Sequence, residues 1–142
     1  MHRKSKNQKL CVHKDSGIQE NQIYLVSKFI VFCARVLPVN GNFEIHIVSD
    51  REESGITTTA AYHPGMGKVV VYGKNRALVD IMRSVAHEMV HMMQDEMGMI
   101  KGKIRDIGGF HENQANAGSG ALIKAFAKVI QGGEKIYESK RN

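Results

Sequence analysis

Apolar residues recur at helical spacing in three segments of the chain. In the first segment they follow one another at steps of three and four positions, at Ile23, Val26, Ile30, Cys33 and Leu37. This spacing is typical of one buried face of a helix. We expect this helix to begin at Ser16, because Ser16 and Gln19 have the spacing of a capping box, and to end before Pro38.

Two further helices are predicted in the second half of the chain. Residues 76–97 carry an apolar stripe formed by Leu78, Met82, Val85, Met89 and Met92 or Met93. Gly98 follows this segment and is a natural helix stop. A last helix is expected over residues 111–130, before the pair Gly132-Gly133.

The segment between the first two helices has the period of two that is typical of strands. Phe43, Ile45 and Ile47 alternate with Glu44 and His46. Further strands are expected at residues 56–62, rich in threonine, and 69–72, with a glycine-rich turn between them. The pattern therefore predicts an α+β fold with the order α-β-β-β-α-α and a small, mostly antiparallel sheet of three strands.

Composition indicates a single folded domain. The chain has 142 residues, of which 42% are hydrophobic and 24% charged, and its two cysteines are Cys11 and Cys33. A chain of this size buries roughly two-thirds of its surface on folding, so it needs no disulfide framework. We expect one domain over residues 16–133, a basic tail at 1–15 and a second tail at 134–142.

The formal net charge of +6 is partly concentrated near the two ends. The basic residues there are Arg3, Lys4, Lys6, Lys9, Lys14, Lys135, Lys140 and Arg141. Solvated, flexible tails are the simplest expectation. A more specific expectation is that these basic ends make a weak contact with nucleic acid, because clustered cations bind phosphates without sequence preference. With no signal-peptide pattern and no stretch suited to a membrane span, we expect a cytoplasmic protein.

The chemistry is concentrated in the motif His87-Glu88-x-x-His91, which falls inside the predicted 76–97 helix. Residues four apart share one face of a helix, so both imidazoles can reach one zinc ion. Roughly 0.02 accidental matches to this motif are expected in a chain of this composition. Beside the histidines, the Glu88 carboxylate is placed to take a proton from zinc-bound water without being a ligand.

A third protein ligand is expected, because catalytic zinc sites commonly combine three protein ligands with one open position. His111 and Glu112 are the downstream candidates. We favour Glu112, because Asn116 lies one helical turn further along the same face. There the Asn116 side-chain carbonyl can accept the free N–H of a ligating imidazole.

The two motifs together resemble the gluzincin branch of zinc metallopeptidases. The form Glu112-x-x-Ala115-Asn116 is similar to the small ImmA/IrrE-type peptidases found in mobile elements, and the resemblance covers roughly residues 18–130. It implies a zincin-like fold in which a glutamate on the helix after the metal helix completes the zinc site. A phage or mobile-element protein would suit this resemblance.

The resemblance also implies where a substrate binds. In similar enzymes the penultimate strand before the metal helix is a sheet edge that holds an extended peptide. Here that strand is residues 57–62, which places Thr59, Ala60 and Tyr62 at the substrate. The sequence departs from the larger thermolysin-like enzymes, because no downstream histidine matches their oxyanion-stabilising residue. Tyr62, His63, Tyr72 and Tyr137 stay open for that role.

We therefore expect a zinc-dependent metallopeptidase that binds one Zn²⁺ per chain, acts on a protein or peptide and uses Glu88 as general base. The alternative hypothesis is a non-catalytic, zinc-stabilised module that binds nucleic acid or protein through its basic tails. The intact Glu88 favours the enzyme, because a purely structural zinc site needs no general base.

Overall fold

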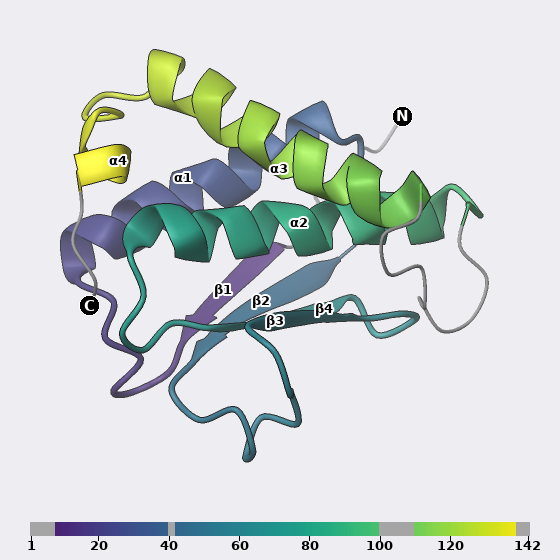
Figure 1. Cartoon of the computed structure of the whole chain (residues 1–142), viewed down its shortest axis with the longest axis horizontal. Helices are drawn as coiled ribbons and strands as arrows, with labels where there is room; N and C mark the ends of the chain where they lie inside the picture. The colour runs from purple at the N-terminus through teal and green to yellow at the C-terminus, as the bar shows by residue number, and fades with distance from the viewer. Residues whose placement is uncertain (1–7, 40–41, 100–109, 139–142) are drawn as a thin grey trace, which may run out of the picture.

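A four-stranded mixed sheet forms one layer of the molecule, and helices cover one of its faces (Figure 1). The computed structural model describes residues 8–39, 42–99 and 110–138. The strand order in the sheet is β1-β2-β4-β3. The strands are β1 (Gln8–Val12), β2 (Phe43–Val48), β3 (Ala60–His63) and β4 (Lys68–Tyr72). The fold class is α+β, as the hydrophobic pattern predicts.

The helices form the second layer. They are α1 (Glu20–Val36), α2 (Leu78–Glu96), α3 (Phe110–Val129) and the short α4 (Lys135–Glu138). The helices predicted at 76–97 and 111–130 are confirmed as α2 and α3. Helices α1 and α2 pack on the sheet, and α3 lies along α2 (Figure 1). The apolar stripe of α2 faces the core, where Met82, Val85 and Met89 are fully buried.

The prediction of a three-stranded, mostly antiparallel sheet is wrong. Strand β1 pairs with β2 and β2 with β4 in parallel, and β3 pairs with β4 antiparallel. Parallel neighbours need a long crossover, which α1 supplies between β1 and β2. A period of two locates a strand but does not reveal its partner, so the parallel pairings could not be seen in the pattern.

Strand β1 lies inside the predicted N-terminal tail of residues 1–15, so that expectation is wrong over Gln8–Val12. Leu10 packs against the core, and the alternation of a strand puts Lys9 and Cys11 on the opposite face. The density of lysines obscured this short alternating pattern. Residues 1–7 of the predicted tail lie outside the described residues.

Two elements begin at other residues in the structure than the sequence predicts. Helix α1 begins at Glu20 rather than Ser16, because Gly17 has a φ of 86°, which a right-handed helix does not allow. Gln19 is the N-cap instead, and its N–H donates to Gln22 Oε1 at 3.0 Å. The strand expected at 56–62 is the shorter β3, and the preceding residues form turns and bends.

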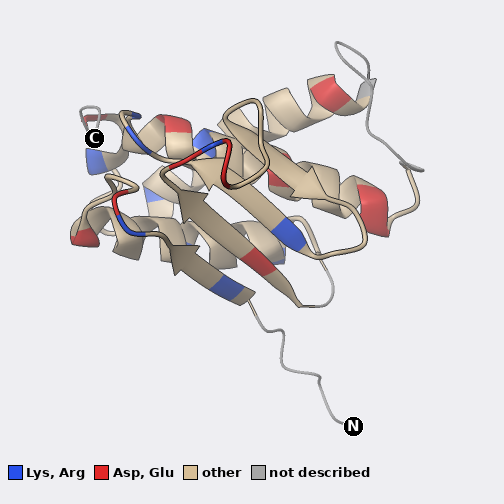
Figure 2. Ribbon diagram, turned by 90° about the horizontal axis from the view of Figure 1, so that it is seen from below, with Lys and Arg blue, Asp and Glu red and all other residues tan. Residues whose placement is uncertain are grey.

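All described helices lie on one face of the sheet, and Figure 2 shows the other face. A small apolar cluster of Val48, Ile56 and Val70 packs there. Next to it a row of charged residues runs across three neighbouring strands, because Glu44 of β2 is paired with Lys9 of β1 and Lys68 of β4.

The predicted C-terminal tail of residues 134–142 contains helix α4, whose Ile136 is fully buried. Helix α4 contacts α2, so the folded domain extends past residue 133. One apolar residue in a charged segment is too weak a signal to predict this. Residues 139–142 lie outside the described residues.

Replacing Ile136 by alanine should therefore destabilise the whole domain. Loss of a fully buried isoleucine side chain typically costs about 2–5 kcal/mol of unfolding free energy. Tyr137→Ala is the matched control, because Tyr137 is 54% exposed and its loss should change stability by less than about 0.5 kcal/mol. Urea denaturation measures both variants, and equal stabilities would show that α4 does not belong to the core.

Candidate metal centre

Helices α2 and α3 bring His87, His91 and Glu112 together. The two imidazoles lie one turn apart on α2, with ring centroids 4.8 Å apart. Glu112, in the first turn of α3, reaches both rings: its Oε1 lies 2.6 Å from His87 Nε2 and its Oε2 lies 3.2 Å from His91 Nε2. The predicted triad of candidate ligands therefore meets at one point.

Small residues on α3 allow the two helices to approach closely enough to bring the three ligands together. Ala115 and Ser119 are fully buried, and a Cβ atom at Gly118 would lie only 3.3 Å from Val90 Cγ2 on α2. Larger side chains at these positions would push the helices apart and move Glu112 away from the histidines. The alanine and glycine content of α3 thus sets the distance across the centre.

Gln94, which is fully buried, determines which ring nitrogen of neutral His91 carries the proton. The Gln94 amide nitrogen donates to the His111 carbonyl oxygen at 3.0 Å and to Gln114 Oε1 at 2.7 Å, which fixes the orientation of the amide. Gln94 Oε1 then accepts a hydrogen bond from His91 Nδ1 at 2.8 Å. Neutral His91 therefore carries its proton on Nδ1 and presents a lone pair at Nε2.

That lone pair faces a carboxylate oxygen. His91 Nε2 and Glu112 Oε2 are both acceptors when the imidazole is neutral, and they lie 3.2 Å apart. Two acceptors at this distance need a cation between them, either a proton or a metal ion. The separation is close to the ~3.3 Å expected between two ligands of a tetrahedral zinc ion.

The donor set also fits zinc. One ligand atom from each of His87, His91 and Glu112 lies within 4.8 Å of the other two. Two imidazoles and one carboxylate are a common catalytic zinc set. His111, the rejected alternative, is not in this group; its backbone carbonyl instead holds Gln94.

Glu88 lies beside the centre and is 8% exposed. Burial raises the pKa of its carboxyl to about 7, and the negative charge of Glu112 adds to the effect. At His87, burial lowers the pKa and outweighs the Glu112 carboxylate and the hydrogen bond with Asn116, which both raise it. The predicted neighbour Asn116 thus contacts a candidate ligand, and the low pKa keeps His87 in the neutral form that binds metals.

An open cleft of about 660 Å³ leads to the centre. Strand β3 and the segment before it line the cleft with all three residues predicted for the substrate, Thr59, Ala60 and Tyr62. Of the four residues considered for the oxyanion role, Tyr62 alone lines it, and its hydroxyl donates to Asp95 Oδ2 at 2.6 Å. Burial and this carboxylate raise the pKa of Tyr62.

Two groups at this site, Arg76 and Gln94, were not predicted from the sequence. Arg76 lines the cleft, where its guanidinium donates to the Tyr72 carbonyl oxygen at 2.8 Å and to Ser84 Oγ at 2.8 Å. No motif marks such a residue. Gln94 could have been found, because it lies three residues after His91 and so on the same face of α2.

Comparisons with protein-family models, with curated proteins and with solved structures gave no match. The interpretation of the centre therefore rests on its residues and their geometry. Within the described part of the chain, no helix combines the length and the apolar character that crossing a membrane requires.

Gln94→Leu should weaken zinc binding while keeping the helix packing, because leucine fills a similar volume but cannot orient His91. The loss of such a supporting hydrogen bond typically costs about 10–100-fold in metal affinity. Gln114→Ala is the control, since it removes another partner of Gln94 and leaves the bond to His91. Competition with a zinc-binding dye measures both, and equal affinities for the parent and Gln94→Leu would contradict the assigned role.

Proposed function

We propose that this protein is a zinc metallopeptidase with a zincin-like, gluzincin-type catalytic domain. The observation that carries the proposal is the convergence of two imidazoles and one carboxylate from two helices beside a buried acid. This group opens into a cleft bordered by a sheet edge. Each of these parts has a role in peptide hydrolysis, and their combination favours the enzyme over a structural metal site.

His87, His91 and Glu112 would hold the zinc ion. Bound there, zinc supplies a Lewis acid that polarises a substrate carbonyl and lowers the pKa of water toward ~7. Gln94 keeps His91 in the tautomer that binds metal. Asn116 supports His87 from α3, as the helical spacing of Glu112 and Asn116 predicts.

Glu88 would act as the general base. Its carboxyl has a pKa near 7 in this buried position, so it can accept a proton from the attacking water and return it to the leaving amine. Because Glu88 and His87 are neighbours on the same helix, α2, the base and the metal ligands keep a fixed relation.

The substrate would bind as an extra strand along β3, which is an edge of the sheet. The Tyr72 N–H donates to the Thr59 carbonyl at 2.8 Å, and hydrogen-bonded residues alternate along antiparallel strands. The backbone groups of Ala60 and Tyr62 therefore point away from β4. An extended peptide can pair with them by main-chain hydrogen bonds.

Of the two arginines that line the cleft, Arg76 rather than Arg83 would offer positive charge to a substrate. Arg83 pairs with Asp80 at 2.9 Å, whereas Arg76 is bound by neutral carbonyl and hydroxyl groups. The Arg76 charge is thus available to a carbonyl oxygen or an acidic side chain of the substrate. The alternative of a nucleic-acid-binding module has less support, because Lys9 of the predicted tail belongs to the sheet.

Glu88→Gln should retain zinc and lose peptidase activity by about 10²–10⁴-fold, the usual contribution of a general base. Glutamine keeps the size of the side chain but cannot accept the proton. The measurement is cleavage of a proteome-derived peptide library by mass spectrometry, with zinc content determined in parallel. Cleavage retained by the zinc-loaded variant would contradict the role of Glu88, and no cleavage by the zinc-loaded parent would contradict the peptidase.

Ala60→Pro should reduce kcat/KM for peptides by at least about tenfold without changing zinc content. Proline removes an N–H that points away from β4, and edge strands tolerate it. Ala61→Pro is the matched control: Ala61 faces β4, so this variant should lose stability instead. Unchanged kcat/KM in folded Ala60→Pro protein would show that the substrate does not pair with β3.

A further inference from the structure

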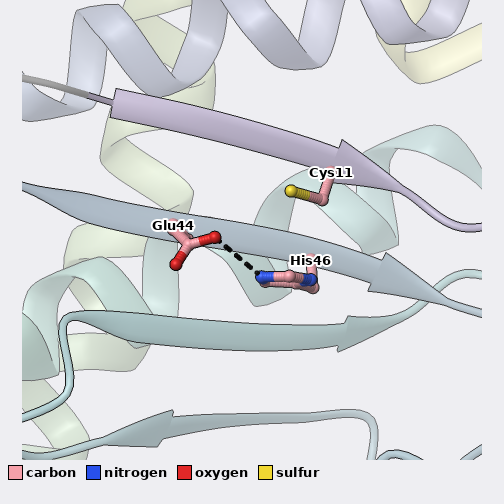
Figure 3. Close-up of side chains that lie close together, drawn as sticks. All are labelled: Cys11, Glu44 and His46. Carbon is pink, nitrogen blue, oxygen red and sulfur yellow. Dashed lines mark ion pairs between the residues drawn. The ribbon is translucent and has the colours of Figure 1, made fainter.

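A second group of metal-binding side chains lies on the sheet face opposite to the helices. Cys11 of β1 and His46 of β2 are cross-strand partners, and Glu44 lies two residues before His46 on the same face. Figure 3 shows Glu44 and His46 next to each other over β2, with the Cys11 thiol on the side of β1. One ligand atom from each lies within 4.8 Å of the other two.

We propose that Cys11, Glu44 and His46 bind a second divalent metal ion of the zinc class. A thiolate, an imidazole and a carboxylate are all zinc donors, and the thiolate disfavours magnesium and calcium. The site uses no residue of the candidate metal centre, so it does not depend on the proposed peptidase function.

His46 is held in an orientation that suits a ligand. Its Nδ1 lies 3.1 Å from His13 Nε2, and its Nε2 lies 3.4 Å from Glu44 Oε1. When Nδ1–H donates to His13, the lone pair of Nε2 points toward Glu44. This is the usual support of a metal-bound imidazole by a second hydrogen-bonding group.

Glu44 and a water molecule can complete the coordination of an ion bound to His46. The Glu44 side chain is 48% exposed and so can change rotamer freely. A hollow of about 400 Å³ borders His13 and His46, so solvent can reach the imidazole that would bind the ion. Lys9 and Lys68 flank Glu44 on the neighbouring strands. Their repulsion toward the ion is limited, because one thiolate and one carboxylate neutralise a divalent cation.

Metal binding here would fasten β1 to the sheet. Strand β1 is an edge strand of five residues and is joined to the sheet through β2. An ion held by Cys11 on one strand and by Glu44 and His46 on the next ties the two together. Because the site needs both strands, binding raises the stability of the folded state by mass action.

Cobalt substitution tests the site directly. A thiolate bound to Co²⁺ gives a sulfur-to-metal charge-transfer band in the near ultraviolet, whereas the candidate metal centre has only nitrogen and oxygen ligands. We expect the band in the parent protein loaded with two equivalents of Co²⁺. We expect Cys11→Ser to abolish it and His46→Ala to weaken Co²⁺ binding at least tenfold. Cys33→Ala is the control and should keep the band, because Cys33 is fully buried in the core.

Absence of the band in the parent protein, or its persistence in folded Cys11→Ser, would overturn the proposal. A measurement on the unchanged chain makes the test independent of folding in the variants. Zn²⁺ should slow the alkylation of Cys11 by a maleimide at least tenfold, because a metal-bound thiolate is shielded. An unchanged rate would overturn the proposal, whatever the outcome for peptidase activity.

Discussion

The buried amide of Gln94 is the constraint on which the candidate metal centre depends. By donating to His111 and Gln114, it leaves only its oxygen for His91 and so fixes the proton of His91 on Nδ1. The free lone pair then faces an oxygen of Glu112, and two acceptors at this distance need a proton or a metal ion between them. Because these contacts join α2 to α3, we expect the affinity of the centre for a cation to depend on the packing of the two helices.

The site could be predicted from the sequence where its geometry is local. His87 and His91 lie one turn apart on a single helix, so their meeting follows from helical periodicity alone. The meeting with Glu112 depends on how α2 and α3 pack, so the sequence indicates it only through the spacing of Glu112 and Asn116 and through the resemblance of the motif. Arg76 could not be predicted, because its place in the cleft depends on the end of β4 and the start of α2.

The fold could be predicted at the level of its class and its long helices. Helix α2 has a strong apolar stripe, so its position follows from the sequence to within two residues at each end. In strand β1, Leu10 packs against the core next to Lys9, and the partner strand β2 follows in the sequence only after helix α1. Such long-range pairing is not encoded in local periodicity. The missed strand is also the one that brings Cys11 to His46.

Zinc content of the purified, untagged Cys11→Ser protein is the most direct test of the central claim, because that background removes the second site. Elemental analysis after zinc reconstitution and dialysis should find about one zinc per chain, as expected for a site with three protein ligands. Adding Glu112→Ala should bring the zinc content well below one. Absence of zinc from the Cys11→Ser protein, or equal zinc in both proteins, would contradict a metal centre built from His87, His91 and Glu112.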